Sequence, residues 1–239
     1  MFGELRVHVH VAPDARDKPA PGGPLIFYWN SAWHPDTRGP SEVLDALGQE
    51  AIDEVVAQGG LIAAPYARRC DLCQSTGTQV WFGEDLALAD RVVACALTHA
   101  RIDTRHIHAV GWSAGALQAV DQLLLRAKYM ASAVSYSGGL SPAEPDDTDS
   151  SNRGAVLLTF GNPDYFVIGL RDQSLRLIER ERPLGRYLLA CDHGGAHEID
   201  PLVAPYAYRF LRDHPYKVTP EPYLDAVPDE FPSYCKSAE

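Results

Sequence analysis

Short apolar segments alternate with amphipathic segments along most of the chain. The first segment, Leu5–Val11, alternates apolar with polar residues, which predicts a half-buried strand at a sheet edge. Most of the later segments are continuous apolar runs, a pattern typical of strands that are covered on both faces. These later strands are predicted at residues 25–29, 61–64, 107–112, 131–136, 155–160 and 186–190.

Between the predicted strands, apolar residues recur at helical spacing. The first such segment begins at Ser41, a residue type that caps helices, and ends before Gly59 and Gly60. Further helices are predicted at 84–98, 116–129, 172–182 and 202–213. Because strands and helices alternate, we expect an α/β fold with a mainly parallel sheet and helices on both faces.

Length and charge narrow the class of protein. A chain of 239 residues is long enough for one domain, so we expect residues 1–239 to form a single unit, with the proline-rich tail 215–239 lying irregularly on its surface. The net charge is −11, and no Lys/Arg stripe is visible, which argues against nucleic-acid binding. No apolar run approaches the ~18–20 residues of a membrane span. The first eleven residues also lack the pattern of a signal peptide.

Five cysteines leave the disulfide pairing open, and an odd number implies a free thiol or an intermolecular bond. Cys70 and Cys73 form a C-x-x-C pair without a second pair or a histidine cluster at zinc-site spacing, so we favour a local disulfide or structural thiols over a metal. A bridge between Cys191 and Cys235 would hold the tail beside the last predicted loop. The fifth cysteine is Cys95.

The most informative motif is Gly111-x-Ser113-x-Gly115, which joins a predicted buried strand to a predicted helix. A serine in such a bend is held in a strained backbone conformation, and the flanking residues must be very small for the turn to pass. Its hydroxyl then projects from the carboxyl end of the strand, near the helix N-terminus, where developing negative charge is stabilised. This context predicts that Ser113 is a nucleophile.

A serine nucleophile needs a base, and the base needs an orienting acid. Asp164 follows the predicted strand 155–160, and His197 follows the last predicted strand in a glycine-containing loop. The order Ser, Asp, His is the one expected for a nucleophile on this type of bend. His193, in the same loop as His197, is the alternative base. The alternative acids are Asp172, Glu144, Asp146, Asp147 and Asp149.

An oxyanion formed by attack of the serine requires two backbone N–H donors. We expect one from Ala114, the residue after the nucleophile, and the other from Ala32 or Ser31, in the loop after the strand 25–29.

Three tryptophans lie near the predicted site loops and are candidates for binding an aromatic substrate: Trp33, Trp81 and Trp112. For Trp112, as for Trp29, core packing is the favoured role, whereas Trp33 and Trp81 lie on predicted loops and are the better candidates.

These features together resemble the α/β-hydrolase superfamily, and within it the polyhydroxybutyrate depolymerase and feruloyl-esterase-like branch. The resemblance covers roughly residues 24–213. It is carried by the bend at 111–115, by Asp164 and His197, by the segment Phe27–Trp33, and by the phrase Ile102–Arg105 before the central strand. It implies an α/β-hydrolase fold, and because the longest irregular insertion is short, we expect no large lid domain.

The resemblance also implies a function. It implies a serine carboxylester hydrolase that uses Ser-His-Asp acyl transfer on aromatic, short-chain or polyester-type esters, without a metal or an organic cofactor. Its substrate would be a small-molecule or polymeric ester. Members of the branch are often secreted, so secretion is implied, with a cytoplasmic location as the alternative. The alternative functions are a serine peptidase, another acyl hydrolase, or a non-catalytic binding protein that retains the fold.

The sequence departs from the branch in the oxyanion loop. Asn30–Ser31 stands where relatives usually carry His-Gly, and a serine restricts a loop that a glycine would leave free. Ala116 also replaces the second glycine that often follows the nucleophile bend. The identity of the second oxyanion donor is therefore the least determined part of the predicted site.

Overall fold

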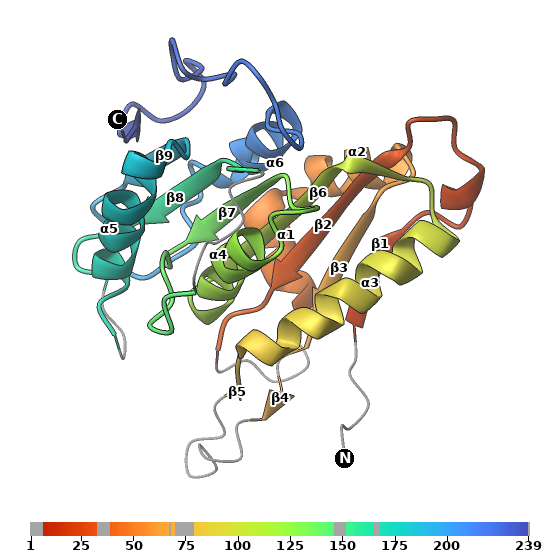
Figure 1. Ribbon diagram of the computed structural model, residues 1–239, viewed down its shortest axis with the longest axis horizontal. Helices are drawn as coiled ribbons and strands as arrows, with labels where there is room; N and C mark the ends of the chain where they lie inside the picture. Colours follow the sequence, from red (N-terminus) through yellow and green to blue (C-terminus); the bar gives the residue numbers. More distant parts are fainter. Residues whose placement is uncertain are drawn as a thin grey trace.

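The computed structural model describes residues 7–32, 39–66, 68–69, 79–145, 152–164 and 168–238. Within them the main sheet has eight strands, in the order β1-β3-β2-β6-β7-β8-β9-β10 (Figure 1). The six inner strands are parallel, whereas β1 and β10 lie antiparallel at the two edges. The strands are β1 Val7–Val11, β2 Gly23–Trp29, β3 Leu61–Pro65, β6 Ile102–Trp112, β7 Ser132–Tyr136, β8 Val156–Phe160, β9 Leu188–Asp192 and β10 Cys235–Ser237, and a separate small ladder joins β4 Arg68–Arg69 to β5 Gln79–Val80.

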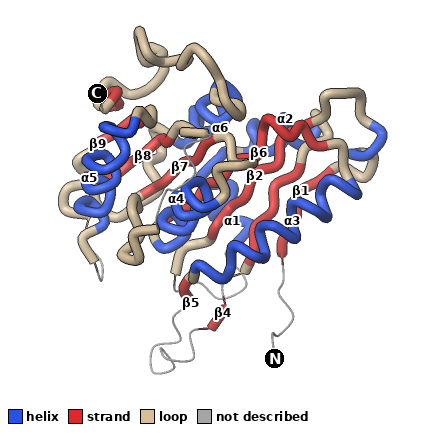
Figure 2. The backbone as a smooth tube through the Cα atoms, in the orientation of Figure 1, coloured by secondary structure: helices blue, strands red, loops and turns tan. Residues whose placement is uncertain are grey.

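Helices cover both faces of the sheet (Figure 2). Two apolar cores, one on each face, contain residues of α1, α2 and α6 on one side and of α3, α4 and α5 on the other. The helices are α1 Gly39–Leu47, α2 Gln49–Ala57, α3 Leu86–His99, α4 Ala114–Leu125, α5 Leu170–Glu181 and α6 Ala204–Asp213. Short 3-10 turns occupy Ala15–Asp17, Gly83–Asp85 and Arg182–Leu184.

The central strand β2 shows why a continuous apolar run is required. Because successive side chains of a strand point to opposite faces, Ile26 and Tyr28 enter one core, whereas Phe27 and Trp29 enter the other. All seven residues of β2 are buried. The predicted α/β architecture with a mainly parallel sheet is confirmed.

The bounds of several predicted elements differ from the structure. The helix predicted to begin at Ser41 starts at Gly39 and is broken into α1 and α2 at Gly48, whose φ of +77° cannot continue a helix. The central strand β6 begins at Ile102, five residues earlier than predicted. The tail is not wholly irregular, because β10 adds to the sheet edge beside β9.

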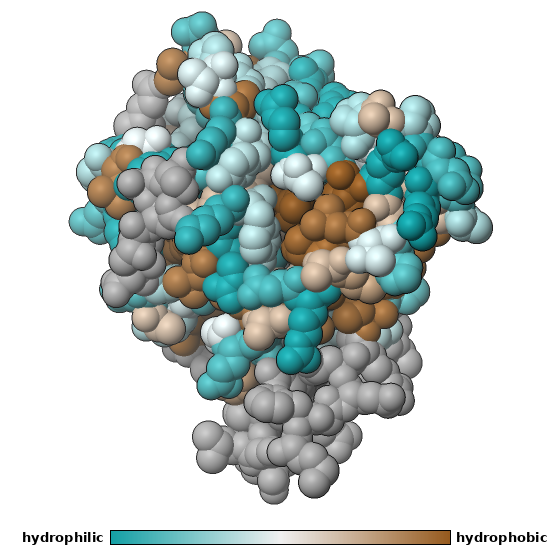
Figure 3. Space-filling model, turned by 45° about the vertical axis from the view of Figure 1, so that its right-hand side comes forward, coloured by the Kyte–Doolittle hydropathy of each residue, from teal (hydrophilic) through white to brown (hydrophobic). Residues whose placement is uncertain are grey.

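The surface is mostly hydrophilic on the face shown in Figure 3, where apolar side chains gather in one area. Within the described residues, no helix combines the length and apolarity that crossing a bilayer demands.

Candidate functional site

Ser113 lies at the sharp turn between β6 and α4. Its backbone has φ 59° and ψ −123°, a conformation that non-glycine residues rarely adopt. Hydrogen bonds hold the turn: Ser113 N–H donates to the carbonyl of Tyr136 at 2.9 Å, and Ala116 N–H donates to the carbonyl of Ser113 at 3.0 Å. The side chain therefore leaves the carboxyl end of the central strand at the N-terminus of α4, as the motif predicted.

The two glycines of the motif are required by close backbone contacts. A Cβ at Gly111 would lie 2.2 Å from the carbonyl oxygen of Gly115, and a Cβ at Gly115 would lie 1.8 Å from the carbonyl oxygen of Trp29. Both distances are far below a van der Waals contact. The turn can thus pack against the end of β2 only when these two positions carry no side chain.

Asp164 and His197 are brought together at the carboxyl ends of the parallel strands. Asp164 follows β8 and His197 follows β9, and these strands are parallel neighbours, so their carboxyl ends meet. The Asp164 Oδ1 and His197 Nδ1 atoms are 2.9 Å apart. Asp164 is 2% exposed. An ionised carboxylate at Nδ1 favours the tautomer with the proton on that nitrogen, which leaves the lone pair on Nε2.

The loop that carries His197 contacts residues at the carboxyl ends of two neighbouring strands, β6 and β7. The Trp112 indole stacks on the His197 imidazole, with ring centres 5.3 Å apart and planes 27° apart. Ser137, which follows β7, donates from its hydroxyl to the carbonyl of Glu198 at 3.1 Å. Because Trp112 immediately precedes Ser113, the stacking contact places the imidazole beside the turn that carries Ser113.

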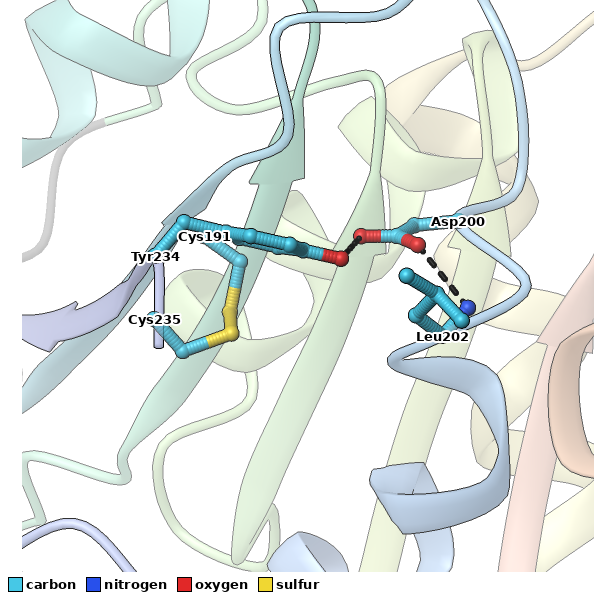
Figure 4. Close-up of a disulfide and its surroundings, with 5 residues drawn as sticks. All are labelled: Cys191, Asp200, Leu202, Tyr234 and Cys235. Carbon is cyan, nitrogen blue, oxygen red and sulfur yellow. Dashed lines mark hydrogen bonds between the residues drawn. A yellow bond between two sulfur atoms is a disulfide. The ribbon is translucent and has the colours of Figure 1, made fainter. Parts of the chain in front are cut away.

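The C-terminal tail supports the same loop from its other end (Figure 4). The Tyr234 hydroxyl donates to Asp200 Oδ2 at 2.8 Å, and Asp200 Oδ1 accepts from the backbone N–H of Leu202 at 2.9 Å. A disulfide joins the adjacent cysteines Cys191 and Cys235, which face each other across β9 and β10. The bridge that the sequence left open is therefore present. Cys95 is a free, exposed thiol, and Cys70 and Cys73 lie outside the described residues.

The competing candidates occupy other surroundings. His193 Nδ1 lies 3.7 Å from Glu198 Oε1, and it accepts the backbone N–H of Gly195 at 3.2 Å. Asp172 is exposed on α5, and Glu144 is an exposed residue that pairs with an arginine of that helix. Three other candidate acids lie outside the described residues: Asp146, Asp147 and Asp149.

The loop after β2 is anchored by a residue that the sequence analysis missed. Glu42, 4% exposed on α1, accepts the backbone N–H of Ser31 at 3.0 Å and the Ser31 hydroxyl at 2.7 Å. The Tyr28 hydroxyl also donates to Glu42, at 3.3 Å. Since Ser31 N–H is directed to this carboxylate, Ala32 is the loop residue that stays a candidate for the second oxyanion donor. Glu42 lies four residues before the buried Ala46, so its position on the covered face of the helix was the available signal.

Two further contacts fix the same loop. Asn30 donates from Nδ2 to the backbone carbonyl of Pro65 at 2.7 Å. The backbone carbonyl of Asn30 accepts the indole N–H of Trp81 at 2.6 Å. Trp81 is half-buried and packs edge-on against the fully buried Trp29, so part of its surface is used in the core. Trp33 lies outside the described residues. The Asn30–Ser31 departure is thus accommodated by specific partners for both residues.

Among the described residues, no group of three or more histidine, cysteine, aspartate or glutamate side chains is arranged to hold a metal ion.

Comparison with known proteins relates this arrangement to one fold. No family model matches the sequence, and no curated protein matches it significantly. Solved structures match over most of the chain. The native pOPH structure has a TM-score of 0.71 at 13% identity and covers 97% of this chain and 89% of its own. Esterase PE8 has a TM-score of 0.64 at 20% identity, and the match covers 89% of this chain and 100% of the PE8 chain. A ferulic acid esterase has a TM-score of 0.60 at 13% identity, and the match covers 87% of this chain and 92% of the esterase chain.

With its eight-stranded, mostly parallel sheet and helices on both faces, the chain has the α/β-hydrolase fold in the form found in these esterases.

Proposed function

We propose that the protein is a serine carboxylester hydrolase in which Ser113 is the nucleophile, His197 the general base and Asp164 the orienting acid. The observation that carries the proposal is the 2.9 Å contact between His197 Nδ1 and Asp164 Oδ1. It lies at the carboxyl ends of the parallel strands, where Ser113 is held at positive φ. A strained serine at a helix N-terminus and a carboxylate-oriented imidazole are the two parts that acyl transfer to serine requires.

The mechanism follows from these groups. His197 Nε2 takes the proton of the Ser113 hydroxyl as the oxygen attacks the ester carbonyl, and the Ala114 and Ala32 N–H groups stabilise the oxyanion. Collapse of the tetrahedral intermediate expels the alcohol, which receives its proton from His197. Water, deprotonated by the same imidazole, then releases the acid and restores Ser113. Asp164 stabilises the imidazolium that forms in each step.

We propose that the substrates are aromatic, short-chain or polyester-type esters. The names of the matched structures, which include a ferulic acid esterase and a carboxylesterase from Bacillus cereus, support this substrate class. Trp112 supports it as well, since its half-buried indole borders His197 and offers a flat apolar surface beside the reacting atoms.

The test is covalent labelling with a fluorophosphonate, followed by peptide mapping. We expect modification at Ser113, loss of labelling in Ser113→Ala, and unchanged labelling in the matched control Ser233→Ala, which alters an exposed serine of the tail. A panel of p-nitrophenyl esters, methyl ferulate and aminoacyl anilides then assigns the substrate class. Faster cleavage of the anilides would favour a peptidase, and a folded protein that is neither labelled nor active would indicate a binding protein.

A further inference from the structure

Arg171, in the first turn of α5, bridges the two strand ends that lead to the proposed acid and base. Its Nη1 donates to the backbone carbonyl of Gly161 at 3.2 Å, and its Nη2 lies 2.8 Å from Asp192 Oδ2. Gly161 follows β8 and opens the turn that leads to Asp164, whereas Asp192 ends β9 and leads into the loop that carries His197. One guanidinium group therefore spans the two segments whose spacing determines the contact between Asp164 and His197.

The start of α5 also fixes the turn between Gly161 and Asp164 through its backbone. The N–H groups of Leu170 and Arg171 donate to the carbonyl of Asp164 at 3.0 and 3.3 Å. The Arg171 guanidinium lies over the Phe160 ring, 5.1 Å from its centre, in a cation–π contact. The turn is thus held at both ends, by main-chain bonds at Asp164 and by the arginine side chain at Gly161.

The turn after β8 and the loop after β9 lie beyond the last register pair of these strands, which is Phe160 opposite Asp192. Two backbone bonds continue the contact. His193 N–H donates to the carbonyl of Phe160 at 3.1 Å, and Asn162 N–H donates to the carbonyl of Gly195 at 2.8 Å. Arg171 adds a side-chain bridge at the same level, so it restrains the two segments shortly before the residues that must meet.

The bridge between Arg171 and Asp192 is partly exposed, because 26% of the arginine side chain and 42% of the aspartate side chain are accessible. The hydrogen bond from Arg171 lowers the pKa of the Asp192 carboxyl below its ordinary value, so both groups are charged at neutral pH. An ion pair as accessible as this adds little to global stability. A displacement of the reacting groups by ~1 Å, in contrast, can lower a rate ~10²-fold. Loss of the bridge should therefore affect catalysis more than stability.

Given the serine-hydrolase mechanism proposed above, on which this inference rests, we propose that Arg171 is a positioning residue for ester hydrolysis. It joins Gly161 to Asp192 and so sets the position of Asp164 relative to His197. A planar guanidinium presents its N–H donors as a rigid fork, so one side chain serves both partners, whereas a lysine ammonium is a compact point charge without that geometry.

The first test is kinetic. Arg171→Met removes the charge and the N–H donors but keeps a flexible side chain that can still cover the Phe160 ring. With p-nitrophenyl acetate as substrate, we expect kcat to fall about ten- to hundredfold while KM stays within about twofold, because the acid and the base move relative to each other. Denaturant unfolding should give a free energy of unfolding close to that of the parent.

Two further variants separate the bridge from a general effect of charge on α5. Arg176→Met is the matched control, because it removes an exposed arginine of the same helix that pairs with Glu144, and it should leave kcat unchanged. Arg171→Lys keeps a charge beside Asp192 without the fork, so its kcat should lie between those of the parent and of Arg171→Met.

A measurement without substrate tests the same bridge. The N–H groups of His193 and Asn162 donate from one segment to the other, so their hydrogen exchange reports whether the turn and the loop stay together. We expect both groups to exchange faster in Arg171→Met and at the parental rate in Arg176→Met.

Several results would overturn the positioning role: a folded Arg171→Met protein with the parental kcat, an equal loss of kcat in Arg176→Met, or a raised KM with unchanged kcat. Parental activity of Arg171→Lys would overturn the requirement for the fork. If the parent is neither labelled by the fluorophosphonate nor active, the proposed function itself fails, together with the catalytic role of Arg171. Parental hydrogen exchange in Arg171→Met, measured on an active parent, would overturn the bridge alone.

Discussion

Removal of the Glu42 side chain should damage stability and catalysis together, for one reason. The carboxylate is buried, and from the described residues it accepts two hydrogen bonds from Ser31 and one from Tyr28. Burial, and then the nearby Glu42, raise the pKa of the Tyr28 hydroxyl well above its ordinary value, so Tyr28 stays protonated and donates. In Glu42→Ala the Ser31 hydroxyl can rotate to another acceptor, but Ser31 N–H and Tyr28 O–H are left buried without their acceptor.

The size of the effect follows from these two donors. A buried polar group left unsatisfied costs about 1–3 kcal/mol, so Glu42→Ala should lower the free energy of unfolding by ~2–6 kcal/mol. That is a large part of the ~5–15 kcal/mol typical of a domain. The same loop places the Ala32 N–H. If that donor is lost from the transition state, kcat should fall ~10²–10³-fold while KM changes little.

The assay combines denaturant unfolding with steady-state hydrolysis of p-nitrophenyl acetate. Glu42→Gln is the matched control, because one amide oxygen still accepts from Ser31 N–H while the amide NH₂ donates to the Ser31 hydroxyl. We expect this variant to keep most of the stability and activity. A folded Glu42→Ala enzyme with the parental kcat would refute the positioning role, and a Gln variant as impaired as the Ala variant would refute the hydrogen-bond explanation. The stability measurement stands even if the protein hydrolyses no ester.

Three further predictions concern the rest of the molecule. Gly115→Ala places a Cβ 1.8 Å from the Trp29 carbonyl oxygen, so it should lower the free energy of unfolding, measured with denaturant, by at least ~1–3 kcal/mol and should lower esterase activity. Parental values for both quantities would contradict the steric argument. Burial raises the pKa of Asp121 to about 6 against the opposing effects of Ser141 and Arg180, so the native state binds more protons than the unfolded state between pH ~4 and 6 and loses stability as the pH rises through that range. Asp121→Asn should therefore stabilise the protein by up to ~3 kcal/mol at pH 7.5 and by little at pH 4, whereas an equal gain in unfolding free energy at both pH values would exclude this cause. Cys235→Ser removes a bridge across a sequence separation of 44 and should lower the free energy of unfolding under non-reducing conditions by ~4 kcal/mol. The control Cys95→Ser, at an exposed free thiol, should leave the free energy of unfolding unchanged. Equal stabilities of the two variants would refute a stabilising bridge.

Local pattern was sufficient for the architecture and for the tight turn at Ser113. The apolar runs of β2, β3 and β8 and the amphipathic spacing of the helices reflect a periodicity of burial that the chain carries residue by residue. Gly111, Ser113 and Gly115 likewise report a steric requirement of one tight turn, which can be recognised without any distant residue. For the same reason, a local signal such as Gly48 could have revealed the break between α1 and α2.

The pairings between distant segments depended on the tertiary structure. His193 and His197 are four residues apart in one loop, and only the position of that loop over Trp112 decides which imidazole meets Asp164. The contacts of Glu42 with the loop after β2, the strand β10 and the Cys191–Cys235 bridge also join segments whose separation no periodicity records. A three-residue edge strand and a single buried carboxylate leave almost no pattern in a sequence, because their stability comes from partners that the folded chain supplies.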